Sequence, residues 1–241
     1  MEFIVAKDYD ELSQKAADII ADIIKNKENP ILGLATGSTP IGTYQKLVEK
    51  NKNGEISFKN TVSVNLDEYL GLDPSNDQSY HYFMNDNLFD HVDIDKNNVH
   101  VPEGGLENPE EDAKKYDELL KEVGRRDVQV LGIGNNGHIA FNEPADQLNV
   151  NTGIVDLTES TIEANKRFFN SVDEVPTRAI SMGLGGIFNA EKIILLISGK
   201  NKHDILVKLL EDQKIDTHIP ASLLALHKDL VVIVDEEAYN G

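Results

Sequence analysis

The sequence predicts an α/β fold in which a mostly parallel sheet carries helices on both faces. Short aliphatic runs alternate with amphipathic stretches of helical period along the whole chain. Glycine-containing polar loops follow several of these runs, as they do at the ends of parallel strands. The 241 residues contain no internal repeat, low-complexity tract or linker, so we expect a single α/β domain over residues 1–241.

The elements follow one another in a regular order. We expect strands over residues 3–5, 30–35, 61–65, 99–101, 128–132, 179–182, 192–197 and 230–234. We expect helices over residues 9–24, 80–88, 109–123, 183–189 and 202–210, and one that begins near Pro40. Asp8 is the candidate N-cap of the first helix, with Glu11 at the spacing of a capping box. Parallel strands place their carboxyl ends on one edge, where such sheets bind ligands.

Charge and composition exclude several classes of protein. The formal net charge is −19, so we expect neither a nucleic acid nor a membrane as a partner. The chain has no cysteine, and its histidines lack metal-binding spacing, so we expect no zinc site. The N-terminus does not resemble a signal peptide, and no aliphatic run is long enough to span a bilayer. We therefore expect a cytoplasmic protein, in which an anionic substrate would need locally placed cations.

The loop after the second expected strand suits a phosphate group. It reads LATGSTP and leads into a helix, whose first N–H groups and partial positive charge favour anions. Gly37 permits close approach of the backbone, and the hydroxyls of Ser38 and Thr39 can donate hydrogen bonds. The loop lacks the Gly-Lys-Ser/Thr ending of a Walker A motif. Taken alone, an ordinary capped strand–helix turn explains it equally well.

Two adjacent acids, Asp67 and Glu68, follow the third expected strand directly. A carboxylate at the carboxyl edge of a sheet can act as a general base when burial raises its pKa. Taken alone, the pair is more typical of a helix N-cap followed by a solvated acid.

The loop LGIGNNGHIAFNEPA places His138 among glycines and asparagines, with Asn136 before it and Glu143 after it. Either Glu143 or Asn136 could orient the imidazole for general acid/base catalysis. The glycines mimic a dinucleotide fingerprint, but the residues that follow are a poor start for its phosphate-binding helix. A nucleophilic pair of Ser38 and His138 lacks the G-x-S-x-G elbow that would expose the serine. General acid/base catalysis is therefore the favoured interpretation.

Together, the three loops resemble those of the glucosamine-6-phosphate deaminase family. The segments LATGSTP, NLDEYLGL and GNNGHIAFNEPA occur in the family's order. The resemblance continues through NKRFF, SMGLGGIFNAEKIILLISGKNK and PASLLALH, and covers nearly the whole chain. It implies a Rossmann-like sheet and conversion of D-glucosamine 6-phosphate and water to D-fructose 6-phosphate and ammonia. This reaction couples aldose–ketose isomerisation to deamination in amino-sugar catabolism, and needs no cofactor.

The resemblance also implies a role for each site residue. Asp67 would move a proton between C2 and C1 of the sugar, and His138, supported by Glu143, would open the pyranose ring. The implied phosphate ligands are Gly37, Ser38, Thr39, Arg167 and Lys202. Asn136 departs from the family pattern, because some members have Asp there. We therefore expect a less favoured imidazolium at His138, with Glu143 as its only obvious carboxylate partner.

Three alternatives compete with this interpretation. A 6-phosphogluconolactonase shares the glycine-rich loop but fits the NLDEY and FNEP segments poorly. A deaminase for galactosamine 6-phosphate stays open, because the sequence does not place the side chains that select the epimer. A non-catalytic sugar-phosphate sensor would need a DNA-binding segment, for which a first strand at Phe3 leaves no room.

The sequence also bears on regulation. Some members of the family are hexamers that N-acetylglucosamine 6-phosphate activates through basic residues in the strand after the EPA segment and a longer C-terminal segment. Residues 151–156 read NTGIVD here and contain no Lys or Arg, and the chain ends at Gly241. We therefore expect a monomer or small homo-oligomer with hyperbolic kinetics.

Overall fold

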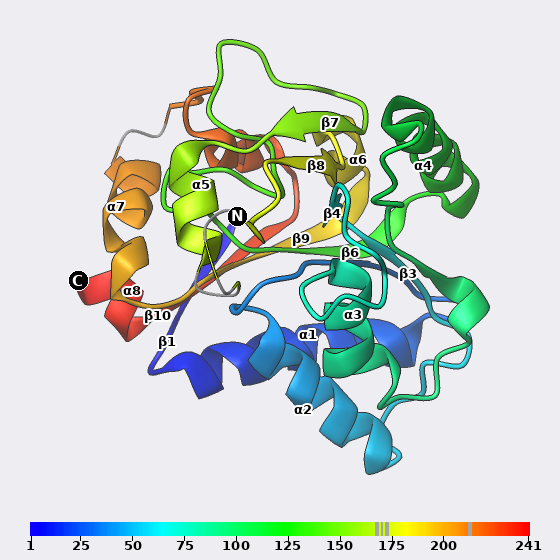
Figure 1. Ribbon diagram of the computed structural model, residues 1–241. Helices are drawn as coiled ribbons and strands as arrows, with labels where there is room; N and C mark the ends of the chain where they lie inside the picture. Colours follow the sequence, from blue (N-terminus) through cyan, green and yellow to red (C-terminus); the bar gives the residue numbers. More distant parts are fainter. Residues whose placement is uncertain (167–168, 170, 172–173, 212–213) are drawn as a thin grey trace.

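A parallel sheet of seven strands runs through the centre of the protein (Figure 1). The computed structural model describes residues 1–241 except 167–168, 170, 172–173 and 212–213. In spatial order, the strands are β1 (Glu2–Ala6), β10 (Leu230–Asp235), β9 (Ala190–Ile197), β6 (Arg126–Leu131), β2 (Ile31–Leu34), β3 (Val62–Asn65) and β5 (Val99–His100). Every neighbouring pair in this sheet is parallel. The predicted α/β class is confirmed.

The central strands are buried because helices cover both faces of the sheet. Strands β9 and β10 are paired from Leu230 opposite Ile193 to Val234 opposite Ile197. Nearly every side chain of these two strands is buried. Such continuous aliphatic runs are typical of parallel strands that have no solvated face. Figure 1 shows α1 (Tyr9–Asn26) and α2 (Ile41–Lys52) beneath the sheet and α6 (Leu184–Phe188) above it.

Further helices connect the remaining strands or follow the last of them. They are α3 (Tyr80–Met84), which continues into a π-helical turn (Asn85–Phe89), α4 (Pro109–Val123), α5 (Glu159–Asn165), α7 (His203–Glu211) and α8 (Glu236–Asn240). Short 3₁₀ turns cover Lys96–Asn98, Lys200–Lys202 and Pro220–Leu226. Among the described helices, none is long and apolar enough to cross a membrane.

The start of α1 shows how local sequence sets a boundary. Asp8 accepts a hydrogen bond from the Glu11 amide at 2.9 Å, as the predicted N-cap should. The Glu11 carboxylate accepts from the amide of Lys7 at 2.7 Å. The predicted capping box is therefore only half correct, since its returning bond goes to the residue before the cap.

A second sheet of three antiparallel strands stands apart from the first. Its strands are β4 (Asp67–Tyr69), β8 (Arg178–Ser181) and β7 (Gly153–Asp156), in that spatial order. The sequence predicts β8 but gives it no separate sheet, and it predicts a loop where β4 forms. A single residue, Leu66, separates β3 from β4, so the chain passes directly from one sheet to the other. This junction places Asp67 beside the carboxyl edge of the parallel sheet.

Candidate active site

The loops that carry the predicted site residues meet at the carboxyl edge of the parallel sheet. They follow β2, β3, β6 and β9, which terminate on the same side because the strands are parallel. Ligands bind outside this edge in open α/β sheets. The described residues of the candidate site lie mainly on these loops and on β4, with further residues on neighbouring helices.

The loop after β2 forms a polar hollow at the start of α2. Gly37 has φ +91°, a left-handed conformation that glycine adopts without steric penalty. The hydroxyl of Tyr9 on α1 lies 3.1 Å from the carbonyl oxygens of both Ser38 and Thr39 and holds the loop in place. A hollow of about 400 Å³ is lined by Tyr9, Ser38, Thr39, Ile41, Gln45 and Ser198. Pro40, at the N-cap position of α2, makes no capping hydrogen bond, and the Tyr9 hydroxyl accepts from the amide of Gly42 at 2.8 Å. The other amides of this first turn are suited to an anion.

The loop after β9 contributes a cation to this region. Ser198, the residue after β9, lines the hollow beside Ser38 and Thr39. Lys202 follows four residues later and donates to the side-chain oxygen of Asn135 at 2.6 Å, which joins it to the loop after β6. Arg167, the other predicted phosphate ligand, lies outside the described residues.

Asp67 is a buried acid at the junction of the two sheets, with only 5% of its surface exposed. Burial raises the pKa of its carboxyl group to about 8, and the nearby charge of Glu68 adds to this effect. A hydrogen bond from the hydroxyl of Thr36, in the loop after β2, opposes the shift. The raised pKa makes the ionised form of Asp67 a stronger base than an ordinary carboxylate. Such a base is suited to abstraction of a proton from carbon.

Glu68 has a different task, because its carboxylate is saturated by hydrogen bonds. One oxygen accepts from the amides of Tyr69 and Tyr80, at 2.8 and 3.0 Å, and the other accepts from the amide of His81 at 3.0 Å. The Nδ1 atom of His81 lies 2.9 Å from this second oxygen. Glu68 therefore fixes the first turn of α3 to β4, and Asp67 is the acid that remains available for chemistry.

His138, Glu143 and Asn136 form a compact hydrogen-bonded cluster in the loop after β6. The Nδ1 atom of His138 lies 3.3 Å from Oε2 of Glu143, and the Asn136 amide donates to this same oxygen at 2.7 Å. The side-chain oxygen of Asn136 accepts from the backbone amide of His138 at 3.2 Å. Asn136 thus bridges the other two residues, and Glu143 accepts the Nδ1 proton when His138 carries one there.

The pKa of Glu143 reflects two opposing influences. Burial would raise it, but hydrogen bonding to His138, the charge of the imidazolium form, and hydrogen bonds from Thr161 and Asn136 together lower it. The carboxylate is therefore ionised at neutral pH and serves as a fixed acceptor.

Gly134 leaves room for the His138 ring. A Cβ atom built on Gly134 would overlap the Cε1, Nδ1 and Nε2 atoms of the imidazole. The amide of Gly134 also donates to the carbonyl oxygen of His138 at 2.9 Å. Any side chain at this position would therefore displace the imidazole.

An aromatic cluster connects this loop to Asp67. The ring of Phe141 lies 6.4 Å from that of His138 and is stacked on Tyr80, with centroids 6.2 Å apart. The amide of Phe141 donates to the hydroxyl of Ser181 at 3.1 Å, and Ser181 is paired with Asp67 across β8 and β4. The candidate acid/base groups thus belong to one packed unit.

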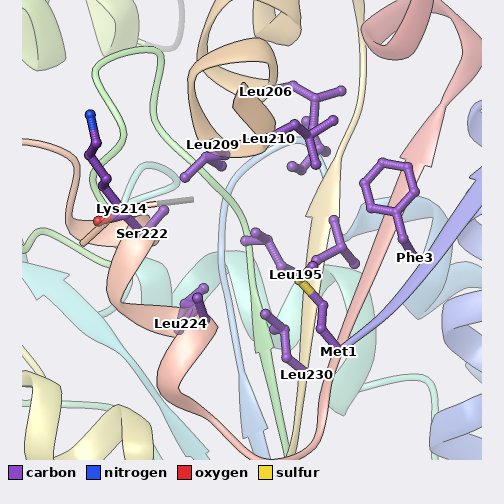
Figure 2. Close-up of a pocket in the computed structure, with 14 residues that line it drawn as sticks. Met1, Phe3, Leu195, Leu206, Leu209, Leu210, Lys214, Ser222, Leu224 and Leu230 are labelled. Atoms are coloured by element: carbon purple, nitrogen blue, oxygen red, sulfur yellow. The ribbon is translucent and has the colours of Figure 1, made fainter. Parts of the chain in front are cut away.

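A larger hollow of about 430 Å³ lies elsewhere, between α7, the Pro220–Leu226 turn and strands β1, β9 and β10 (Figure 2). Figure 2 shows mostly apolar side chains around it, among them Phe3, Leu206 and Leu224, with Lys214 and Ser222 as polar members. Its lining includes none of the site residues described above. Because acid/base chemistry and phosphate binding both need polar groups, the carboxyl edge is the candidate active site.

Three further polar residues of the site carry no clear signal in the sequence. Thr36 contacts Asp67, Tyr80 hydrogen-bonds to Thr36, and Thr161 hydrogen-bonds to Glu143. Thr36 could have been included because it belongs to the LATGSTP loop. The other two meet the site only through the folded chain.

The fold and the site define a sugar-phosphate enzyme of the α/β class, and comparison with known proteins agrees. The chain belongs to the glucosamine-6-phosphate isomerase/6-phosphogluconolactonase family, whose model matches residues 7–233. It is 53% identical over 241 residues to a glucosamine-6-phosphate deaminase of Clostridium beijerinckii (strain ATCC 51743 / NCIMB 8052), covering 100% of this chain and 99% of that protein. It is 52% identical to the same enzyme of Thermoanaerobacter sp. (strain X514), covering 99% and 94% of the two chains.

Solved structures place the chain near the deaminase branch of the family. A monomeric glucosamine-6-phosphate deaminase superposes with a TM-score of 0.97 at 44% identity, covering 100% of this chain and 99% of that one. A 6-phosphogluconolactonase from Thermotoga maritima superposes with a TM-score of 0.75 at 22% identity, covering 98% and 99%. At that identity, the second comparison shows a shared fold alone.

Proposed function

We propose that this protein is a glucosamine-6-phosphate deaminase, an enzyme that hydrolyses a carbon–nitrogen bond without a cofactor. It converts D-glucosamine 6-phosphate and water to D-fructose 6-phosphate and ammonia in amino-sugar catabolism. The observation that carries the proposal is the pairing of a buried, high-pKa Asp67 with the His138–Glu143 pair at one sheet edge. The 52–53% identity to deaminases over at least 99% of the chain supports it.

The substrate phosphate binds in the hollow at the start of α2. The backbone of Gly37 and the hydroxyls of Ser38 and Thr39 donate hydrogen bonds to it, and Lys202 supplies positive charge. By family resemblance, Arg167 supplies a second cation. Local cations are needed because the protein carries a formal net charge of −19.

Ring opening is the first chemical step. His138 accepts the proton of the anomeric hydroxyl and returns a proton to the ring oxygen as the bond between C1 and that oxygen breaks. The products are the free aldehyde and an unchanged imidazole. Glu143 accepts the Nδ1 proton of His138, which leaves Nε2 as the nitrogen that exchanges protons with the sugar.

Isomerisation and deamination follow from the open chain. Asp67 removes the proton on C2 while the aldehyde oxygen takes up a proton from solvent, which gives a 2-amino-enol. Asp67 then delivers its proton to C1, and the amino group loses a proton to solvent. The nitrogen on C2 is then part of an imine, to which water adds. Loss of ammonia leaves the ketone of fructose 6-phosphate, and Asp67 ends in its starting ionisation state.

The location of the substrate indicates the location of the enzyme. A sugar phosphate does not cross a membrane unaided, so we place the enzyme in the cytoplasm with its substrate. We also propose a monomer or small homo-oligomer, which the monomeric state of the 44%-identical deaminase supports.

One assay tests the proposal. The purified protein is incubated separately with glucosamine 6-phosphate, galactosamine 6-phosphate and free glucosamine, and ammonia and the ketose product are measured. We expect equal amounts of ammonia and fructose 6-phosphate from the first compound, and slow turnover of free glucosamine because it lacks the phosphate. Absence of ammonia would exclude deaminase activity, and faster turnover of the galactosamine compound would reassign the substrate.

A further inference from the structure

Thr161, on α5, reaches the catalytic cluster from outside the loop after β6. Its side chain is buried, with 4% of its surface exposed, and its hydroxyl donates to Oε1 of Glu143 at 2.5 Å. Hydrogen bonds from a hydroxyl to a charged carboxylate are among the stronger ones in proteins. Thr161 is 18 residues from Glu143 in sequence, so this contact is made by tertiary structure.

The direction of the hydrogen bond is fixed by a second threonine. The hydroxyl of Thr158, the N-cap of α5, donates to the oxygen of Thr161 at 3.1 Å. The same Thr158 oxygen accepts from the amide of Thr161 at 3.3 Å. Because the oxygen of Thr161 already accepts one bond, its single proton is directed at Glu143. The start of α5 thus orients the Thr161 hydroxyl toward the carboxylate.

The two oxygens of Glu143 are held by different groups. Oε2 faces His138 and accepts from Asn136, whereas Oε1 accepts from Thr161. Bonds on both oxygens fix the rotation of the carboxylate about its last single bond, a rotation that is otherwise broad. Without the bond to Oε1, the carboxylate could turn and weaken its alignment with Nδ1 of His138.

We propose that Thr161 is a positioning residue of the reaction, which holds the Glu143 carboxylate in the plane where it orients His138 for ring opening. This inference rests on the proposed deaminase function. Thr161 itself does not touch the reacting atoms in this scheme. The hydrogen bond from Thr161 brings α5 into direct contact with the catalytic pair. The site motifs assign no such role to α5.

The test compares Thr161→Val with Thr161→Ser. Valine keeps the branched shape and removes the hydroxyl, whereas serine keeps the hydroxyl. We expect Thr161→Val to lower kcat about tenfold or more with little change in KM, because the loss lies in an orientation needed during reaction. The Thr161 bond lowers the pKa of Glu143, so this pKa, followed by NMR of the carboxyl group, should rise in this variant. Thr161→Ser should recover most of kcat and the lowered pKa of Glu143.

Thr61→Val is the matched control. Thr61 is also fully buried, its hydroxyl has no hydrogen-bond partner among the described residues, and it precedes β3 at the opposite end of the sheet. This variant should keep the wild-type kcat and the wild-type pKa of Glu143.

The outcomes separate the two proposals. A wild-type protein that releases no ammonia from glucosamine 6-phosphate would reject the function itself. An active wild type with unchanged kcat in Thr161→Val would reject the positioning role. Equal losses in the valine and serine variants, or a rise in KM alone, would likewise overturn it in favour of a structural or binding role.

Discussion

Asp67 and Glu68 are neighbours in sequence, yet their surroundings give them opposite properties. Glu68 binds the amides at the start of α3, whereas Asp67 is buried and its pKa is raised to about 8. In the free enzyme, kcat/KM should therefore increase with pH up to about 8, as Asp67 becomes the carboxylate that acts as base. Asp67→Asn should keep the fold and lower turnover by several orders of magnitude. Near-wild-type turnover in this variant, measured as ammonia release, would reject Asp67 as the base.

The same raised pKa has a consequence for stability. The ordinary pKa is 3.8, so between this value and about 8 the folded protein holds a proton that the unfolded chain has released. Unfolding then releases a proton, and the contribution of Asp67 to the free energy of unfolding falls as pH rises, by up to about 1.4 kcal/mol per unit. Urea unfolding at pH 5.5 and 7.5, without ligand, measures this slope. Asp67→Asn should show a smaller decrease, and identical slopes would contradict the assignment.

At the scale of the elements, the loop after β6 depends on a glycine at position 134. Gly134→Ala would push a methyl group into the His138 ring, so we expect kcat to fall at least about tenfold and stability to drop by about 1–3 kcal/mol. Turnover and chemical unfolding measure the two effects. The control is Gly132→Ala, because a Cβ there has no neighbouring atom within 4 Å and the variant should keep its stability. If Gly134→Ala matched wild type in turnover, the ring would not depend on this contact.

Regular elements were predictable where a local pattern specifies them. The aliphatic runs of β9 and β10 and the apolar face of α1 mark buried surfaces directly. The helix α4 covers Pro109–Val123, as predicted, with Pro109 at its first position. Strand β4 has only three residues, two of them acidic, and carries no such pattern. It forms because its backbone pairs with β8, with Asp67 opposite Ser181.

The site was predictable to the extent that its residues lie in glycine-rich loops after strands. Asp67, His138 and Glu143 stand out because their motifs combine acids or histidine with turns. Thr161 and Tyr80 do not, because an isolated hydroxyl on a helix has many uses. Their contacts depend on the packing of α5 and α3 against the sheet edge, which no local spacing encodes.

At the scale of the whole molecule, the second sheet bears on regulation. Strand β7 contains no basic residue, and the exposed Asp156 lies 3.8 Å from the guanidinium of Arg178 on β8. This strand offers no cation that could distinguish two states through a phosphate ligand, so it has no means to drive a switch. We expect hyperbolic dependence of rate on substrate and no activation by N-acetylglucosamine 6-phosphate. Sigmoidal kinetics that the acetylated sugar abolishes would contradict this expectation.

The pairing of β4 with β8 also sets when the protein can become active as it is synthesised. Asp67 and its partner Ser181 are 114 positions apart (181 − 67), so β4 has no partner strand until most of the chain has left the ribosome. Contacts of such long sequence separation are slow to form. During refolding, helices such as α1 and α2 should appear before the base is in place. Recovery of deaminase activity should therefore lag behind recovery of helical signal.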